Sequence, residues 1–92
     1  MPRRPLSVAE TSHFSDTLKQ LKVSTQEADE ILHGVLFIIA RKPREGIRIA
    51  PGSRVWAIPF DDPTAPNQSY VLYYTFDSEK VHLLALRPSS ED

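Results

Sequence analysis

Two arginines, Arg48 and Arg54, are of the residue type that can neutralise a phosphodiester while it is cleaved. A guanidinium is always charged and stabilises the negative charge that develops on a phosphoryl oxygen, so this chemistry requires no metal. A proton must also move, and Tyr73 and His82 are of types that transfer protons or stack against a base. We therefore predict a phosphate-directed site with Arg48 and Arg54 as the catalytic candidates.

A basic segment lies in the middle of a chain whose total charge is only −1. Residues 41–54 carry a net charge of +4, whereas residues 7–30 carry −3 and residues 55–92 carry −4. A strip of this sign attracts phosphates, or an acidic protein segment, over a Debye length of about 8 Å. The alternative is that these are solvated loop charges paired with neighbouring carboxylates. On the first interpretation, the candidates for binding nucleic acid are Arg41, Lys42, Arg44, Tyr73 and His82.

Most other catalytic chemistries lack the residues that they require. The chain has no cysteine, which excludes disulfides, thiolate metal sites and a thiol nucleophile. Its three glycines are too far apart for a phosphate-binding loop, and its three histidines stand alone, so no cofactor or metal is expected. The charge-free apolar run of residues 31–40 is about half the length that spans a bilayer. No apolar signal segment follows Arg3 and Arg4, and a cytoplasmic location is expected.

Two helices are predicted in the N-terminal half of the chain. From Ser12, a suitable N-cap, apolar residues recur at helical spacing over residues 14–21. Residues 24–27 match the S/T-x-x-E capping box, and a broad apolar stripe follows until Pro43 ends the second helix. So broad a stripe predicts that the second helix lies across a sheet.

After Pro43 the hydrophobic period changes to that of β-strands. Strands are predicted over residues 47–50, 54–60, 70–76 and 81–87, and residues 6–9 are compatible with a further short strand. Pro59 cannot donate to a ladder, so its strand lies at an edge or ends there. Short loops favour an antiparallel meander. We predict one α+β domain over residues 1–92, in which two N-terminal helices cover one face of a small antiparallel sheet, mixed at the first strand. Residues 1–5 are predicted to form a flexible arm and residues 88–92 a polar tail.

The aromatic residues of the predicted strands are also core candidates. Tyr70 and Tyr74 share a strand face with Leu72, which favours burial of both rings, whereas Tyr73 lies on the opposite face. Trp56 is expected to anchor the core as well. His82 shares a face with two leucines, residues 84 and 86, so a buried, hydrogen-bonded histidine is the alternative to a functional one.

The order of these elements and several of their residues resemble the RelE/ParE superfamily of toxins from bacterial type II toxin–antitoxin systems. The resemblance rests on a P-x-x-G turn after the second helix, two tyrosines in a following strand, and an aliphatic last strand that ends in a basic residue. These features are residues 43–46, Tyr70 and Tyr74, and residues 81–87. The resemblance covers nearly the whole chain, from about residue 6 to residue 87.

This resemblance implies a β-α-α-β-β-β fold, ribosome-dependent mRNA cleavage or interference with DNA gyrase, and neutralisation by a cognate antitoxin protein. Such a cleavage activity is that of a metal-independent endoribonuclease. The resemblance adds Arg87, at the end of the last strand, to Arg48 and Arg54 as a catalytic candidate. Two features depart from the family: Val71 stands where its members carry an arginine, and the chain is not basic overall. Each neutralised phosphate adds to RNA affinity, so both departures weaken RNA attraction. The alternative is a non-catalytic protein-binding module of the same fold.

Overall fold

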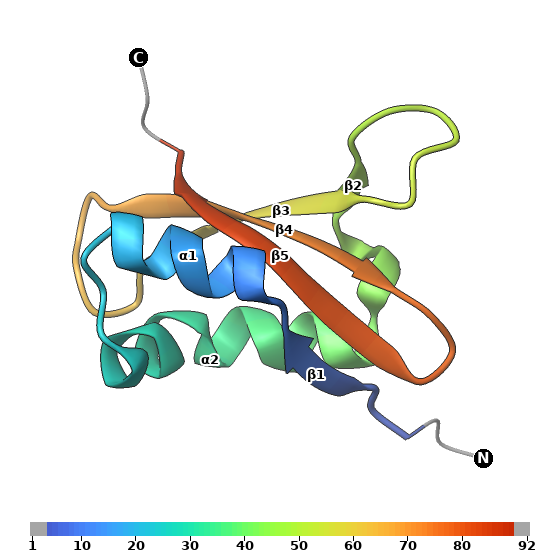
Figure 1. The fold of residues 1–92 in the computed structure, drawn as a ribbon, viewed down its shortest axis with the longest axis horizontal. Helices are drawn as coiled ribbons and strands as arrows, with labels where there is room; N and C mark the ends of the chain where they lie inside the picture. The colour runs from blue at the N-terminus through green and yellow to red at the C-terminus, as the bar shows by residue number, and fades with distance from the viewer. Residues whose placement is uncertain (1–3, 90–92) are drawn as a thin grey trace.

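Within residues 4–89, which this computed structural model describes, two α-helices pack on one face of a five-stranded sheet (Figure 1). The elements in chain order are β1 (Ser7–Glu10), α1 (Ser12–Gln20), α2 (Thr25–Arg41), the 3₁₀ turn η1 (Pro43–Glu45), β2 (Ile47–Arg48), β3 (Trp56–Asp61), β4 (Ser69–Phe76) and β5 (Lys80–Pro88). The predicted α+β fold is confirmed. Residues 1–3 and 90–92, which belong to the predicted arm and tail, lie outside the described residues.

The strands are arranged in the order β1-β5-β4-β3-β2. β1 pairs parallel with β5, and the other neighbours are antiparallel, so the sheet is mixed at its first strand as predicted. β2 pairs with Trp56 and Ala57 of β3, and no other strand of residues 4–89 pairs with the rest of β3 on that side. The Ile49 N–H donates to the Val55 carbonyl at 3.1 Å, and by ladder alternation the backbone nitrogen of Pro59 faces this open edge. Proline therefore removes no ladder bond there, and the predicted edge position is confirmed.

The two helices begin at side-chain caps. The predicted capping box of α2 is confirmed: Glu27 N–H donates to the Ser24 hydroxyl at 3.1 Å, and Ser24 N–H donates to the Glu27 carboxylate at 3.0 Å. For α1 the predicted cap is one residue late. Thr11, not Ser12, accepts from Phe14 N–H, because the Thr11 hydroxyl is also fixed by donation to the Leu83 carbonyl at 2.8 Å. A tertiary contact therefore selects the cap.

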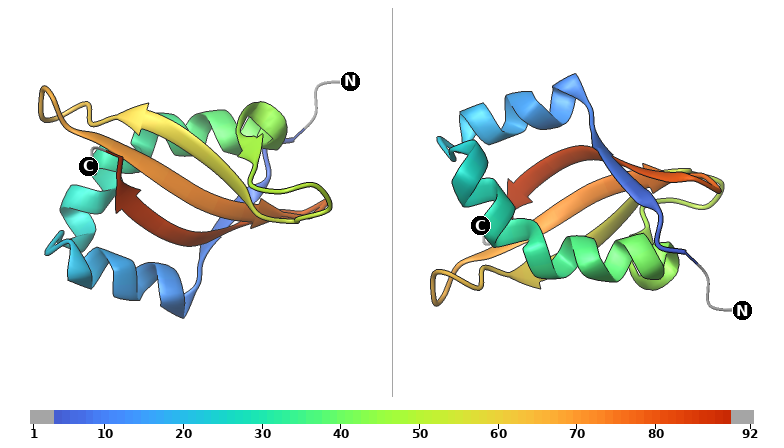
Figure 2. Two further views of the ribbon diagram at one scale, coloured as in Figure 1. Left: turned by 90° about the horizontal axis from the view of Figure 1, so that it is seen from above. Right: turned by 90° about the horizontal axis from the view of Figure 1, so that it is seen from below.

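The core lies between the helices and the face of the sheet that they cover. Figure 2 shows α2 lying across that face, as its broad apolar stripe predicts. Tyr70 and Tyr74 are buried, which confirms the prediction for both rings. Trp56 is only half-buried and packs at the margin of the core. It therefore contributes to the core but does not anchor it, contrary to the prediction. The largest fully buried side chains are Phe14, Ile39, Leu72, Tyr74, Val81, Leu83 and Leu86.

α1 completes the sheet edge that β1 leaves open. β1 pairs with β5 only from Lys80 to Leu83. Further along β5, the Leu86 N–H donates to the buried Thr17 hydroxyl at 3.1 Å, and that hydroxyl donates to the Phe14 carbonyl at 2.7 Å. A helix side chain thus takes the place of a strand partner, and no buried donor is left unpaired at this point.

A register shift in β5 changes which of its residues face the helices. Tyr73 pairs with Ala85 and Tyr74 pairs with Leu83, so Leu84 is the additional residue of a bulge. His82 therefore does not share a face with Leu86, and its side chain is 35% exposed on the face opposite the helices. The interpretation of His82 as a buried residue is wrong, because the bulge at Leu84 interrupts the alternation that would place His82 on the face of Leu86.

Candidate nucleic-acid interface

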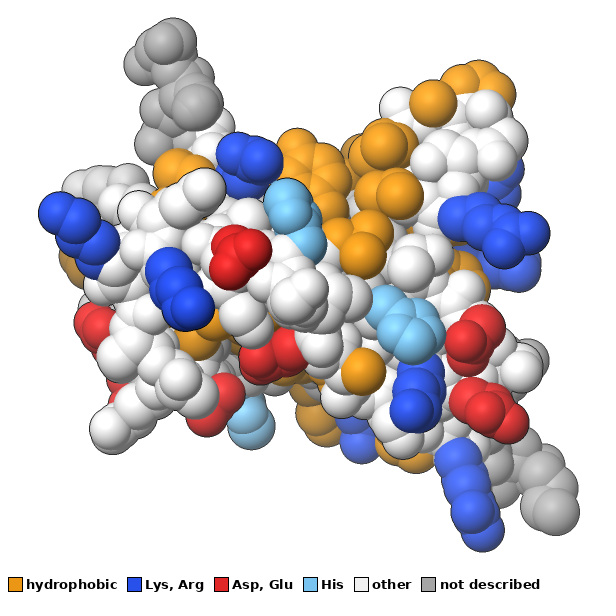
Figure 3. Space-filling model, viewed as in Figure 1, with side chains coloured by type: hydrophobic (Ala, Val, Ile, Leu, Met, Phe, Trp, Pro, Cys, Tyr) orange, Lys and Arg blue, Asp and Glu red, His pale blue; other side chains and the backbone are white. Residues whose placement is uncertain are grey.

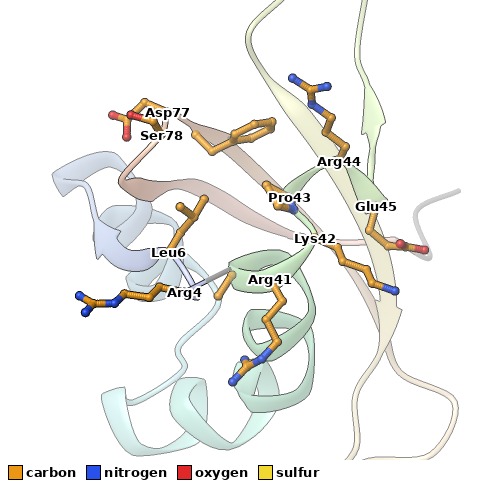
Figure 4. A pocket seen from close by; sticks show the side chains of 11 residues that line it. Arg4, Leu6, Arg41, Lys42, Pro43, Arg44, Glu45, Asp77 and Ser78 are labelled. Carbon is orange, nitrogen blue, oxygen red and sulfur yellow. The ribbon is translucent and has the colours of Figure 1, made fainter. Parts of the chain in front are cut away.

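A hollow opens between the C-terminal end of α2, the β4–β5 turn and the hairpin that joins β2 to β3 (Figure 4). It has two adjoining parts of about 1020 Å³ and 370 Å³ that share Arg44 and Phe76, and we call them together the basic hollow. The larger part is lined by Arg4, Leu6, Ala40, Arg41, Lys42, Pro43, Arg44, Glu45, Phe76, Asp77 and Ser78. The smaller part is lined by Arg44, Arg48, Gly52, Ser53, Arg54, Trp56 and Phe76.

Six cationic side chains line the basic hollow, and its only carboxylates within residues 4–89 are those of Glu45 and Asp77. The cations are Arg4, Arg41, Lys42, Arg44, Arg48 and Arg54, and all six are exposed. Across the described part of the chain, the one ion pair joins His82 to Asp77 at 3.4 Å. None of the six cations is therefore neutralised by a carboxylate contact in residues 4–89, contrary to the alternative that the basic segment is internally paired.

The end of α2 fixes the first of these cations. The Arg41 guanidinium donates to the Phe37 carbonyl at 3.3 Å, and its central carbon lies 3.7 Å from the centroid of the Phe37 ring. A cation at this helix end also interacts favourably with the helix dipole. Pro43 then ends α2 and begins η1, which carries Arg44 to the junction of the two parts of the hollow.

Two aromatic rings form a wall of the smaller part of the hollow. The ring centroids of Trp56 and Phe76 lie 5.7 Å apart at an interplanar angle of 51°, and both residues are half-buried. Arg48 is the register partner of Trp56, and its guanidinium carbon lies 5.3 Å from the Trp56 ring centroid. Cations beside partly exposed aromatic rings are the combination that binds the backbone and bases of single-stranded nucleic acid.

The cations are spread around the hollow rather than directed at one point. In Figure 4 the Arg44 side chain extends toward the hairpin, whereas the side chains of Arg4 and Arg41 extend away from it and from each other. In Figure 3, Lys and Arg side chains gather at the base of the same hairpin. This arrangement suits a ligand with several phosphates along its length better than a single small anion.

Five of the eight predicted site residues line the basic hollow, and three do not. The five are Arg41, Lys42, Arg44, Arg48 and Arg54. Tyr73, His82 and Arg87 lie on the opposite face of the sheet, because each stands next to a residue whose side chain faces the helices. The structure therefore does not bring Arg87 together with Arg48 and Arg54.

The hollow is also lined by residues outside the predicted site, and among these Trp56, Phe76 and Arg4 are the three that add an aromatic ring or a cation. Trp56 and Phe76 occupy core-facing strand positions, and the alternation cannot show that the helix layer ends before it reaches them. Arg4 reaches the hollow because Leu6 N–H donates to the Ala40 carbonyl at 2.8 Å, which fixes the start of the described chain beside α2. No sequence pattern connects Arg4 with residues 40–44.

The described lining residues are better suited to holding phosphate than to moving protons. They include no histidine and no tyrosine. The backbone N–H groups of Glu79 and Lys80, each 2.8 Å from the Asp77 carboxylate, lower its pKa, so Asp77 is ionised at neutral pH and cannot act as a general acid. Within residues 4–89, no three His, Cys, Asp or Glu side chains gather in a way that could hold a metal ion.

The opposite face of the sheet is different in character. Ile47 and Ile49 are 69% and 53% exposed at its margin. In Figure 3, hydrophobic side chains line the notch between the C-terminal end of β5 and the β2–β3 hairpin. This face therefore presents more apolar than charged surface, in contrast to the basic hollow.

Neither helix of residues 4–89 has the length and apolar character needed to span a bilayer. Comparison of the chain with protein-family models, with curated proteins and with solved structures finds no match.

Proposed function

We propose that this protein binds single-stranded RNA through the basic hollow. The observation that carries the proposal is the set of six exposed cations beside Trp56 and Phe76, with no carboxylate contact to any of them in residues 4–89. Arginine and lysine side chains contact phosphates, and exposed rings stack with unpaired bases. A duplex hides its base faces, so the aromatic wall favours a single strand.

We further propose that RNA binding serves a RelE/ParE-like toxin that inhibits translation. The order β-α-α followed by antiparallel strands, the turn from Pro43 to Gly46 and the buried Tyr70 and Tyr74 support this role. In this proposal the target is mRNA on the ribosome, with DNA gyrase as the alternative target, and a cognate antitoxin neutralises the protein. The geometry supports binding of RNA more directly than its cleavage, because the described lining residues include no histidine or tyrosine that could transfer the proton.

Fluorescence anisotropy with a labelled single-stranded RNA tests the binding proposal. Each phosphate contact with a single strand makes the slope of log K against log salt about 0.7 more negative. The triple variant Arg44→Ala, Arg48→Ala, Arg54→Ala removes three exposed cations from the hollow and should lower affinity about 100-fold at about 0.1 M salt. The matched control Arg87→Ala removes an exposed arginine from the opposite face and should change affinity less than about twofold.

Binding that is equally strong in the triple variant and in the Arg87→Ala control would show that the basic hollow is not the RNA site. A duplex of the same sequence is the second control. The aromatic wall predicts weaker binding of the duplex, whereas equal affinity would indicate attraction by charge alone.

Inducible expression tests the toxin role. The parent protein should arrest growth, co-expression of the protein encoded beside it should restore growth, and the triple variant should be less toxic at equal abundance. If the parent binds RNA but does not arrest growth, RNA binding stands and the toxin role is wrong.

The exposure of Ile47 and Ile49 favours a second candidate, a non-catalytic module that binds a protein partner on the opposite face of the sheet. Such a partner should bind the triple arginine variant as well as it binds the parent. Its affinity should fall at least tenfold in the variant Ile47→Asp, Ile49→Asp, measured by calorimetry with the protein encoded beside this one. The reverse pattern would assign the partner to the basic hollow.

A further inference from the structure

The Tyr74 hydroxyl joins two segments that are far apart in the sequence. Its ring is fully buried under the helices in β4, but its oxygen reaches the turn between α2 and β2. The hydroxyl donates to the Pro43 carbonyl at 2.5 Å and accepts from Gly46 N–H at 3.3 Å. One side-chain group thus holds both ends of this turn.

Gly46 is required by this contact rather than by its backbone conformation. Its φ of −78° is accessible to any residue. A Cβ atom at this position would lie 2.7 Å from the Tyr74 hydroxyl oxygen and 2.7 Å from the Ala57 carbonyl oxygen. Only glycine lets the turn approach β3 and β4 so closely, so the identities of Gly46 and Tyr74 are linked through one contact.

The turn that Tyr74 holds carries arginines of the basic hollow. Arg44 lies between Pro43 and Gly46, and Arg48 follows in β2. β2 has only two residues, each with one register partner in β3, so few other contacts fix the direction of this segment. Burial raises the pKa of Tyr74 above its ordinary value, so the hydroxyl keeps the proton that it donates to Pro43.

We propose that Tyr74 is a positioning residue for the basic hollow, whose hydroxyl orients the segment bearing Arg44 and Arg48 for contact with RNA phosphates. The inference rests on the proposed function. It adds to the residues that determine RNA binding a buried side chain that does not itself touch the RNA. A purely structural role, in which the hydroxyl satisfies two backbone groups and nothing more, predicts lower stability with unchanged RNA binding by the folded protein.

The variant Tyr74→Phe tests this inference, and Tyr70→Phe is its matched control. Both tyrosines are buried in β4, but the surroundings of the Tyr70 hydroxyl are Asp62 and Gln68, far along the chain from Arg44. In anisotropy titrations at a temperature where every variant is folded, Tyr74→Phe should lower RNA affinity about fivefold or more. Its salt slope should become shallower by about 0.7 to 1.4, which corresponds to one or two phosphate contacts. Tyr70→Phe should change affinity less than about twofold.

Hydrogen exchange separates failure of this inference from failure of the proposed function, because it needs no RNA. The Ile49 amide donates to Val55 rather than to Tyr74, so its exchange rate reports on the order of the segment itself. We expect Tyr74→Phe to accelerate this exchange about tenfold, with amides in the middle of α2 unchanged. Gly46→Ala should have the same effect, because the added Cβ displaces the turn from the hydroxyl.

Unchanged exchange at Ile49 in Tyr74→Phe would overturn the positioning role whether or not the parent binds RNA. Accelerated exchange combined with unchanged RNA affinity and salt slope would also overturn it, while leaving RNA binding by the parent intact. If the parent binds no RNA, the proposed function fails, and with it the claim that this segment is oriented toward phosphates.

Discussion

The two faces of the sheet divide the predicted site residues between them. The helix-covered face ends in the basic hollow, where Arg48 lies beside Trp56 and Arg44 joins the two parts. The opposite face carries Arg87 and Tyr73 among apolar neighbours. The separation arises because successive side chains of a strand point to opposite faces, as those of Tyr73 and Tyr74 do.

This division shows that the local charge of a segment and the charge of a surface are different quantities. The +4 segment of residues 41–54 lies on one side of the molecule as a basic surface, since α2, η1 and the hairpin follow each other around one hollow. Arg87 is isolated from it by the alternation of β5. An expectation based on residue type alone therefore identifies cations correctly but does not assign them to one surface.

The largest effect that separates the two faces is on stability. Leu72 is fully buried against the helices, whereas its neighbour Val71 is half-exposed on the opposite face. Leu72→Ala should lower the free energy of unfolding by about 3 kcal/mol, because it removes apolar contacts and leaves a cavity. Val71→Ala should cost less than about 1 kcal/mol. Urea titrations followed by circular dichroism measure both, and similar losses would contradict the assignment of the faces.

A smaller effect is expected where α1 meets β5. Thr17→Val keeps the shape of the side chain but leaves the buried Leu86 N–H without its acceptor, which should cost about 2 kcal/mol. Thr75→Val makes the same chemical change on the opposite face, where the Thr75 side chain is half-exposed, and should cost about 0.5 kcal/mol or less. The same urea titrations compare the two. Equal losses of unfolding free energy in the two variants would show that the hydrogen bond from Leu86 N–H to the Thr17 hydroxyl does not stabilise the protein.

Much of the fold follows from local patterns in the sequence. The capping box at Ser24, the stop at Pro43, the edge position of Pro59 and the burial of Tyr74 each depend on a few neighbouring residues, and each is as predicted. Local physics determines these features because caps, ring constraints and strand alternation act within a few positions.

The remaining features depend on contacts between distant segments. The bulge at Leu84 changes the phase of β5 and is fixed by pairing with β4, so His82 could not be assigned to its face in advance. Thr11 replaces Ser12 as the cap of α1 because of Leu83, and Arg4 joins the hollow because of Ala40. Five of the six cations of the hollow were therefore predictable, whereas Arg4, the aromatic wall and the exclusion of Arg87 were not.

Acid should destabilise the β4–β5 turn, whose residues Asp77 and Ser78 line the basic hollow. Two backbone N–H groups lower the pKa of Asp77, so its contribution to stability is present above the ordinary carboxyl pKa of about 3.9 and is lost as pH falls through the lowered value. Asp77→Asn keeps an acceptor oxygen but does not titrate. The fall in Tm between about pH 4 and pH 2 should be shallower in this variant than in the parent.

The control for that experiment is Asp16→Asn, an exposed carboxylate of α1 for which no side-chain hydrogen bond forms within residues 4–89. It should leave the acid dependence of Tm as in the parent. If Tm falls less steeply with acid in both variants than in the parent, the acid sensitivity comes from overall charge rather than from the turn.

The smallest expected effect gives the sharpest test of which face binds RNA. Val71 is the register partner of Arg87 and Pro59, so an arginine there would lie beside Arg87 on the face opposite the basic hollow. Val71→Arg should therefore change RNA affinity less than about twofold and leave the salt slope unchanged, although it restores the residue typical of the resembled family.

An increase in affinity of about fivefold, with a slope steeper by about 0.7, would instead place the RNA on the face that carries Arg87, Tyr73 and His82. Combining Val71→Arg with the triple arginine variant shows whether RNA can bind to either face of the sheet or only at the basic hollow. If the added arginine restores binding to the triple variant, the opposite face can hold RNA without the hollow. If binding stays weak, the cations around Arg44 are required, and the arginine at position 71 is not a substitute for them.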